Sequence, residues 1–201
     1  MKNKVFTSKF IAGVGILSAV EIVLYILGTV FKIGNLTINL ALLPVAIGAI
    51  FYGPICGLLL GFLNGICALI DPGTQAYCMN TAIFGDWCIF GTFVICFIKC
   101  TLAGFVSGII YKLMNSKGNS SKTKEIVSIV LSCIVVPLIN SGIFLALACV
   151  FYRDDLAAIV GSVISLNGLL ELGIMALLCP AIIRIVQIAK PKLINNSKMD
   201  N

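Results

Sequence analysis

Histidine is absent from this 201-residue chain, and charged residues make up only 11% of it. Without histidine the chain cannot form a Ser-His or Cys-His catalytic pair or a zinc site of the usual type. It also lacks a Walker A phosphate loop, so we do not expect it to hydrolyse ATP. Asp71, Asp154 and Asp155 fall in predicted loops, whereas an intramembrane aspartyl enzyme needs paired carboxylates within its helices. The sequence therefore predicts a protein that is not an enzyme and has no cofactor of its own.

The nine cysteines of the chain are scattered through apolar runs, and no C-x-x-C pair occurs. Free cysteine often behaves as a small buried hydrophobic residue. We therefore predict neither a disulfide framework nor a metal site.

Hydrophobic residues account for 60% of the chain, compared with about 45–50% in soluble domains. One membrane span takes about 20 apolar residues, so the chain has room for about six spans and little else. We predict an all-α integral membrane protein with a single transmembrane domain over residues 1–201. The expected helices cover approximately residues 8–30, 38–51, 54–70, 86–113, 125–151 and 158–188, with a polar loop at 114–124.

Most basic residues lie in three short segments, which the six predicted spans place on one side of the membrane. They are Lys2, Lys4 and Lys9, then Lys112, Lys117, Lys122 and Lys124, then Arg184, Lys190, Lys192 and Lys198. The positive-inside rule makes that side cytoplasmic, so both termini and the 114–124 loop are expected inside the cell. The apolar run from Phe10 to Phe31 is too long for a signal peptide and has no small-residue cleavage site after it. We expect a multi-pass protein of the cell membrane, most simply a bacterial plasma membrane, with no surface for nucleic acid.

Polar side chains within the predicted spans are costly in lipid and so indicate function. Asn64, Lys99, Asn140, Asn167 and Glu171 lie within the helices, and Asn80 lies in the outer loop that follows the third helix. A cavity open to the outside and lined by these six residues would bind a small polar molecule. In that cavity the amides would meet hydroxyl or amide groups, and Lys99 would meet a carboxylate. Alternatively, Lys99 and Glu171 neutralise each other and the amides only bridge helices.

Glycines recur every four residues along the third predicted helix, at Gly53, Gly57, Gly61 and Gly65. Such a ridge of small residues lets a second backbone approach closely, because packing rather than hydrophobicity joins helices in lipid. We expect this helix to be central and its ridge to serve packing within the molecule.

Three stretches resemble the substrate-binding S components of energy-coupling factor (ECF) transporters. The first runs from Asn39 through Gly53-Pro54 to Gly61, the second is Lys99-x-x-x-Ala103-Gly104, and the third runs from Val136-Pro137 to Phe144. The resemblance covers most of the chain. It implies a six-helix bundle that binds a vitamin or similar micronutrient in an outward-facing pocket, gripped by the outer parts of helices four to six and the loop after helix three.

The resemblance also implies partners. An S component associates with a membrane coupling protein and two cytoplasmic ATPases, which hydrolyse the ATP. The family docks through an Ala-x-x-x-Ala patch on its first helix, for which Gly15-x-x-x-Ala19 is the nearest equivalent here, with Ala12 one turn earlier. Polarity rich in asparagine with one deep lysine suits a hydroxylated or amide-bearing carboxylate such as pantothenate.

Two other functions remain open from the sequence. A stand-alone proton- or sodium-coupled carrier would use Glu21 or Glu171 as its coupling carboxylate. A membrane scaffold would bind no ligand, and its buried amides would serve stability alone.

Overall fold

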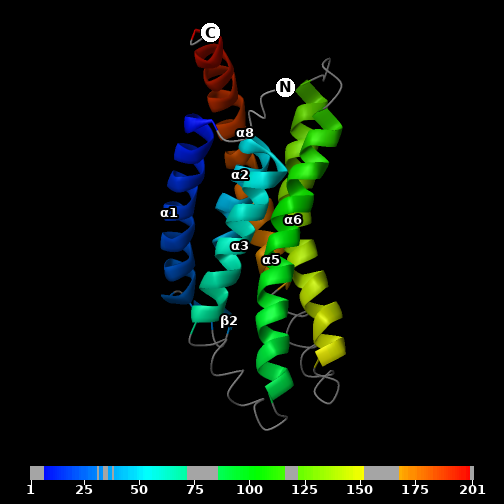
Figure 1. Ribbon diagram of the computed structural model, residues 1–201. Coiled ribbons are helices and arrows are strands. Elements are labelled where there is room, and N and C mark those ends of the chain that lie inside the picture. The colour runs from blue at the N-terminus through cyan, green and yellow to red at the C-terminus, as the bar shows by residue number, and fades with distance from the viewer. Residues whose placement is uncertain are drawn as a thin grey trace.

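The computed structural model describes residues 7–30, 32–33, 36–37, 39–71, 86–115, 122–151 and 168–199. The described residues form a bundle of helices that run alternately up and down (Figure 1). The helices are α1 (Ser8–Val30), α2 (Leu42–Tyr52), α3 (Pro54–Ile70), α5 (Asp86–Asn115), α6 (Lys122–Phe151) and α8 (Gly168–Met199). Two short antiparallel strands, β1 (Lys32–Ile33) and β2 (Leu36–Thr37), connect α1 to α2 and were not foreseen from the sequence.

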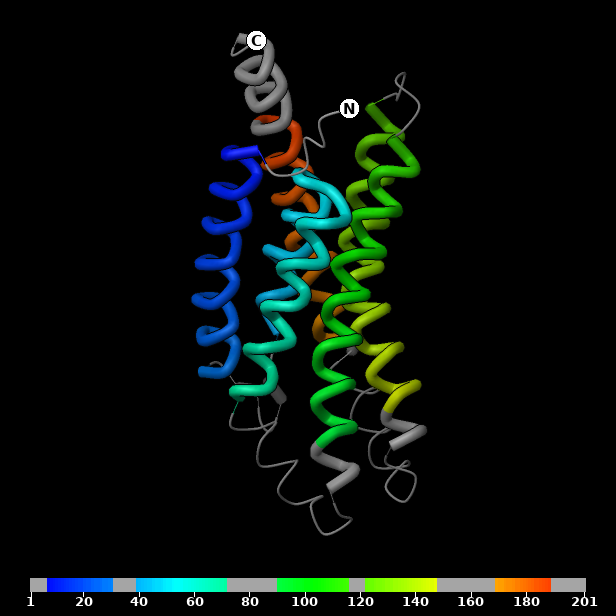
Figure 2. Tube along the Cα trace, in the orientation of Figure 1, coloured from blue at the N-terminus to red at the C-terminus, as the bar shows by residue number. Residues whose placement is uncertain are grey.

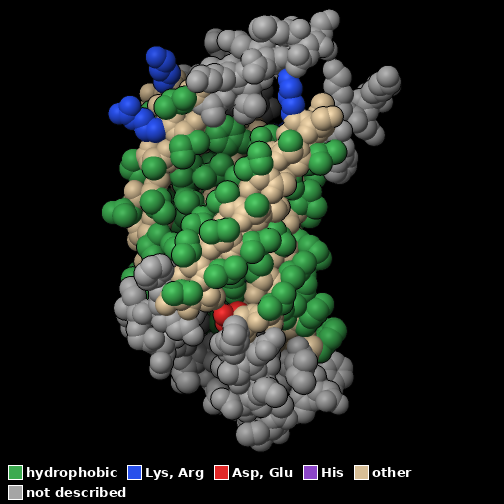
Figure 3. All heavy atoms as spheres, turned by 90° about the vertical axis from the view of Figure 1, so that its left-hand side faces the viewer, with side chains coloured by type: hydrophobic (Ala, Val, Ile, Leu, Met, Phe, Trp, Pro, Cys, Tyr) green, Lys and Arg blue, Asp and Glu red, His purple; other side chains and the backbone are tan. Residues whose placement is uncertain are grey.

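Four of these helices are long and apolar enough to cross a membrane, namely α1, α5, α6 and α8, whereas α2 and α3 are shorter. Large hydrophobic side chains lie on the outside of the bundle, with Ile16 66% and Leu177 79% exposed. Figure 3 shows hydrophobic side chains over the α1 side of the molecule, with basic side chains near one end. A surface of this kind is suited to lipid rather than to water. The prediction of an all-α membrane protein is confirmed.

The helix boundaries follow the predicted ones closely in the first half of the chain. α1 and α3 cover the predicted residues, and α2 begins at Leu42 rather than at residue 38. Pro44 lies in the first turn of α2, where a missing backbone N–H costs nothing. α5 ends at Asn115, and α6 already begins at Lys122, so the loop between them is shorter than residues 114–124.

The last helix differs most from its predicted range. The structure describes it from Gly168 to Met199, whereas the sequence predicted residues 158–188. Residues 158–167 lie outside the described residues. The predicted end at Ile188 is wrong, because helical backbone continues through the basic segment after the apolar run has ended. Hydropathy marks where lipid contact stops, and a helix can go on into water beyond that point.

The glycines of α3 pack against α5. A Cβ atom on Gly57 would collide with the backbone carbonyl of Gly104, and one on Gly61 would collide with the carbonyl of Cys100. Gly53, at the junction of α2 and α3, has a φ of +90° that L side chains rarely adopt. The glycine ridge therefore brings two backbones of the same chain together, as predicted.

The starts of α1 and α6 lie at the same end of the bundle (Figures 1 and 2), and the end of α8 lies there too (Figure 1). These helix ends adjoin the three basic segments of the sequence. The alternating bundle thus gathers the basic segments on one side.

Candidate functional site

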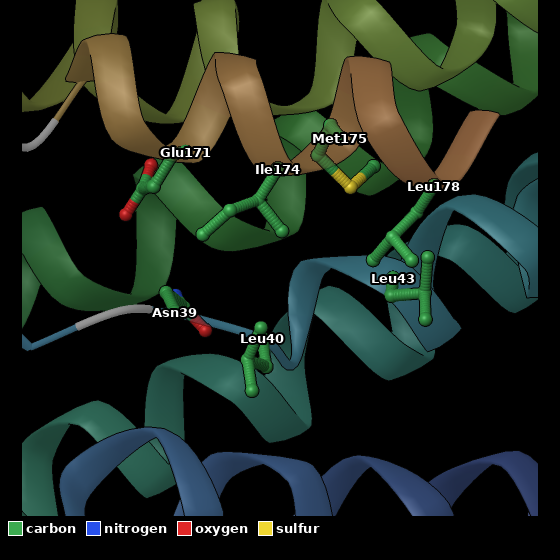
Figure 4. Close-up of a pocket in the computed structure, with 7 residues that line it drawn as sticks. All are labelled: Asn39, Leu40, Leu43, Glu171, Ile174, Met175 and Leu178. Atoms are coloured by element: carbon green, nitrogen blue, oxygen red, sulfur yellow. The ribbon is translucent and has the colours of Figure 1, made fainter. Parts of the chain in front are cut away.

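A pocket lies between the start of α2 and one face of α8, with about 220 Å³ of empty space that is partly open to solvent. Its lining on α8 consists of Glu171, Ile174, Met175 and Leu178, and its lining before and within α2 consists of Asn39, Leu40 and Leu43. The four α8 residues share one helical face, because positions three, four and seven residues apart lie above one another. Figure 4 shows Glu171 and Asn39 together at one end of the pocket and the apolar side chains along the rest of it.

The Glu171 carboxylate is held by α6 from outside the pocket. Its side chain is only 8% exposed, and the Asn140 side chain forms a hydrogen bond with it. The Cys100 thiol donates to Asn140 Oδ1 over 3.6 Å. Since Oδ1 accepts from the thiol, the amide nitrogen of Asn140 is the atom that donates to the carboxylate. Residues of α5, α6 and α8 thereby fix the orientation of Glu171.

Lys99 of α5 supplies the nearby positive charge. Its ammonium group interacts electrostatically with the Glu171 carboxylate and lies 5.0 Å from the centroid of the Phe144 ring. A cation at this distance from an aromatic face is attracted by the ring. Lys99 is therefore occupied by groups of the protein itself and partly compensates the charge of Glu171.

Two buried oxygen atoms in the pocket lining receive no hydrogen bond from the described part of the chain. Neither Glu171 Oε2 nor Asn39 Oδ1 has a hydrogen-bond partner among the residues that the structure describes. An unsatisfied buried polar atom costs about 1–3 kcal/mol. Both atoms are acceptors, so this end of the pocket can bind a molecule that brings hydrogen-bond donors.

The structure brings three of the six predicted site residues together, namely Lys99, Asn140 and Glu171. Asn64 on α3 is fully buried and is not among the described residues that line the pocket. Asn80 and Asn167 lie outside the described residues.

Sequence reasoning missed Asn39 and Phe144 as contributors to the site. Asn39 stood at the start of a stretch used for the family resemblance and at the very start of the predicted helix 38–51, and it was not counted among the buried polar residues; the structure places it before α2, which begins at Leu42. The apolar lining on α8 could have been found from the sequence. Ile174, Met175 and Leu178 follow Glu171 by three, four and seven residues and therefore share its helical face.

The opposite faces of α1 differ in character. Glu21 has no exposed surface, whereas Ala12, Gly15 and Ala19 are exposed. None of the described atoms lies within 4 Å of a Cβ atom built on Gly15. The predicted docking residues therefore form an open strip of small side chains on the outside of the bundle.

A bundle with four long apolar helices and a small pocket with a polar end belongs to the class of membrane proteins that can hold a small molecule. The family model of the ECF transporter substrate-specific component matches residues 9–183, and the chain belongs to this family. Its members are specificity subunits of transporters rather than enzymes, and in general they work with a transmembrane coupling component and ATPases. No curated protein and no solved structure matches the chain.

Proposed function

We propose that this chain is the specificity subunit of an ATP-driven micronutrient importer. It binds a small polar molecule from the outer face, in the pocket between α2 and α8, and delivers it through a separate coupling module. The observation that carries this proposal is a pair of acceptors, Glu171 Oε2 and Asn39 Oδ1, that find no donor among the described residues and lie at one end of an otherwise apolar pocket. Family membership supports the same function.

The proposed partners are a membrane coupling protein and two cytoplasmic ATPases, which supply the ATP hydrolysis that this chain does not perform. The exposed strip of Ala12, Gly15 and Ala19 supports docking, because small residues allow a second helix to approach closely. The gathering of the basic segments at one end of the bundle supports a bacterial plasma membrane orientation with that end in the cytoplasm.

We propose a pantothenate-like molecule as the cargo, on the strength of its hydroxyl and amide groups. Its carboxylate has less support as a binding determinant. Lys99 already interacts with Glu171 and Phe144, and it is not among the described residues that line the pocket.

Uptake into proteoliposomes containing this chain, the coupling protein and the two ATPases tests the proposal. Radiolabelled pantothenate and a mixed vitamin pool serve as cargo, with ATP enclosed or omitted. We expect uptake that requires ATP and the ATPases and that persists with an ionophore. Uptake that collapses with the ionophore at constant ATP would instead identify an ion-coupled carrier, and a chain that binds and moves nothing would identify a scaffold.

A further inference from the structure

We infer that the molecule in the α2–α8 pocket presents uncharged hydrogen-bond donors, hydroxyl or amide N–H groups, to Glu171 Oε2 and Asn39 Oδ1. Its apolar portion lies along the aliphatic side chains of α2 and α8. This inference rests on the proposed function and names the chemistry that the site selects.

The demand for a donor comes from two atoms on different elements. Glu171 and Asn39 lie together at the same end of the pocket (Figure 4). In both residues an oxygen atom is buried and finds no donor within the described part of the chain. A ligand with two hydrogens to donate, one for each oxygen atom, relieves both costs, whereas a ligand carboxylate at this place adds a third acceptor and a second negative charge.

The preference for an uncharged donor over a cation comes from Lys99. Its ammonium group already interacts with the Glu171 carboxylate, so the negative charge facing the pocket is partly compensated. A cationic ligand would meet that compensated charge and would also be repelled by Lys99. A neutral hydroxyl or amide forms the same hydrogen bonds without this repulsion.

The rest of the lining calls for an apolar body. Leu40 and Leu43 line one side of the pocket, and Ile174, Met175 and Leu178 of α8 line the other (Figure 4). The empty space of about 220 Å³ includes space open to solvent. A molecule with a hydroxylated end and a branched aliphatic part matches this lining.

Binding measurements on the full chain in detergent test the inference. The purified protein is incubated separately with pantothenate, pyridoxine, nicotinate and thiamine, and native mass spectrometry reports which are retained. Pantothenate, itself an anion, and pyridoxine offer uncharged hydroxyl donors, nicotinate is an anion without a hydroxyl, and thiamine joins a hydroxyl to a permanent positive charge and so tests the repulsion by Lys99. We expect retention of pantothenate or pyridoxine and no retention of nicotinate or thiamine.

The retained ligand is then titrated against three pocket variants. Glu171→Leu removes the acceptor and is expected to weaken binding about tenfold to a hundredfold. Glu171→Gln keeps an acceptor oxygen but removes the charge and is expected to weaken binding much less. Asn39→Ala tests the second acceptor without altering a charge, in case Glu171→Leu fails to fold. Glu125→Gln, at the distant end of α6, is the matched control.

The outcomes separate this inference from the proposed function. Retention of nicotinate or thiamine would overturn the inference and leave the transport function standing. The inference would also be overturned if Glu171→Gln lost as much ligand affinity as Glu171→Leu. Unchanged ligand affinity in both Glu171→Leu and Asn39→Ala would overturn it as well. A wild-type chain that retains none of the four, and no co-purifying molecule, would overturn the proposed function itself.

Discussion

Glu21 lies on the inner face of α1 with no exposed surface. Neither of its carboxyl oxygens has a hydrogen-bond partner in the described part of the structure. We expect Glu21→Met, which keeps a similar volume and removes the unsatisfied oxygens, to stabilise the protein by about 1–3 kcal/mol. Thermal unfolding in detergent measures the change, with Ile22→Leu on the exposed face as control. A lower melting temperature in Glu21→Met would mean that the carboxyl group has a stabilising partner.

The charge pair of Lys99 and Glu171 gives a second prediction at this scale. Removing one partner leaves the other charge without compensation in a largely apolar bundle. We expect Lys99→Met alone to lower the free energy of unfolding. Adding Glu171→Gln to the same chain is expected to recover part of that loss, with a coupling energy of about 1–2 kcal/mol between the two positions. A double-mutant cycle of unfolding free energies measures this coupling, and strictly additive effects would contradict the pairing.

The contact between α3 and α5 gives a prediction about an element. Gly57→Ala places a methyl group against the carbonyl of Gly104, and overpacking of this kind costs about 1–3 kcal/mol. Gly142→Ala and Gly173→Ala are the controls, because no described atom lies within 4 Å of a Cβ built at either position. We expect a lower melting temperature for Gly57→Ala and an equal or higher one for the controls, since alanine favours helix. Equal stability of all three variants would show that α3 and α5 can move apart to accommodate the methyl group without a loss of stability.

The outer face of α1 gives a prediction about the whole molecule and its assembly. Gly15→Leu fills a position that is open within the described structure, so folding and ligand binding are expected to stay unchanged. Association with the coupling protein is expected to fall at least tenfold, because a leucine keeps the partner helix at a distance. Co-purification of the coupling protein measures association, and native mass spectrometry measures ligand retention. Gly142→Leu on α6 is the matched control, and equal assembly of both variants would place docking elsewhere.

The membrane location, the bounds of α1 and α3, and the family all followed from the sequence. Apolar runs of sufficient length, the Tyr52-Gly53-Pro54 junction and the glycine ridge are local signals, and each has a direct structural meaning. The polar residues within the spans were also identified, because their burial in lipid has a cost that does not depend on the neighbouring helix. Local chemistry was therefore sufficient to name Lys99, Asn140 and Glu171.

Only the tertiary structure decided which of these polar residues meet. A helix in lipid is apolar on nearly all sides, so its hydrophobic pattern does not reveal which face turns inward. The sequence therefore could not show that Asn140 and Lys99 both approach Glu171 while Asn64 stays outside the pocket lining. It also could not place Asn39 opposite Glu171, because residues far apart in the chain meet only through the packing of α2 against α8. The sequence determined the helices and their location in lipid, and long-range packing determined which residues form the site.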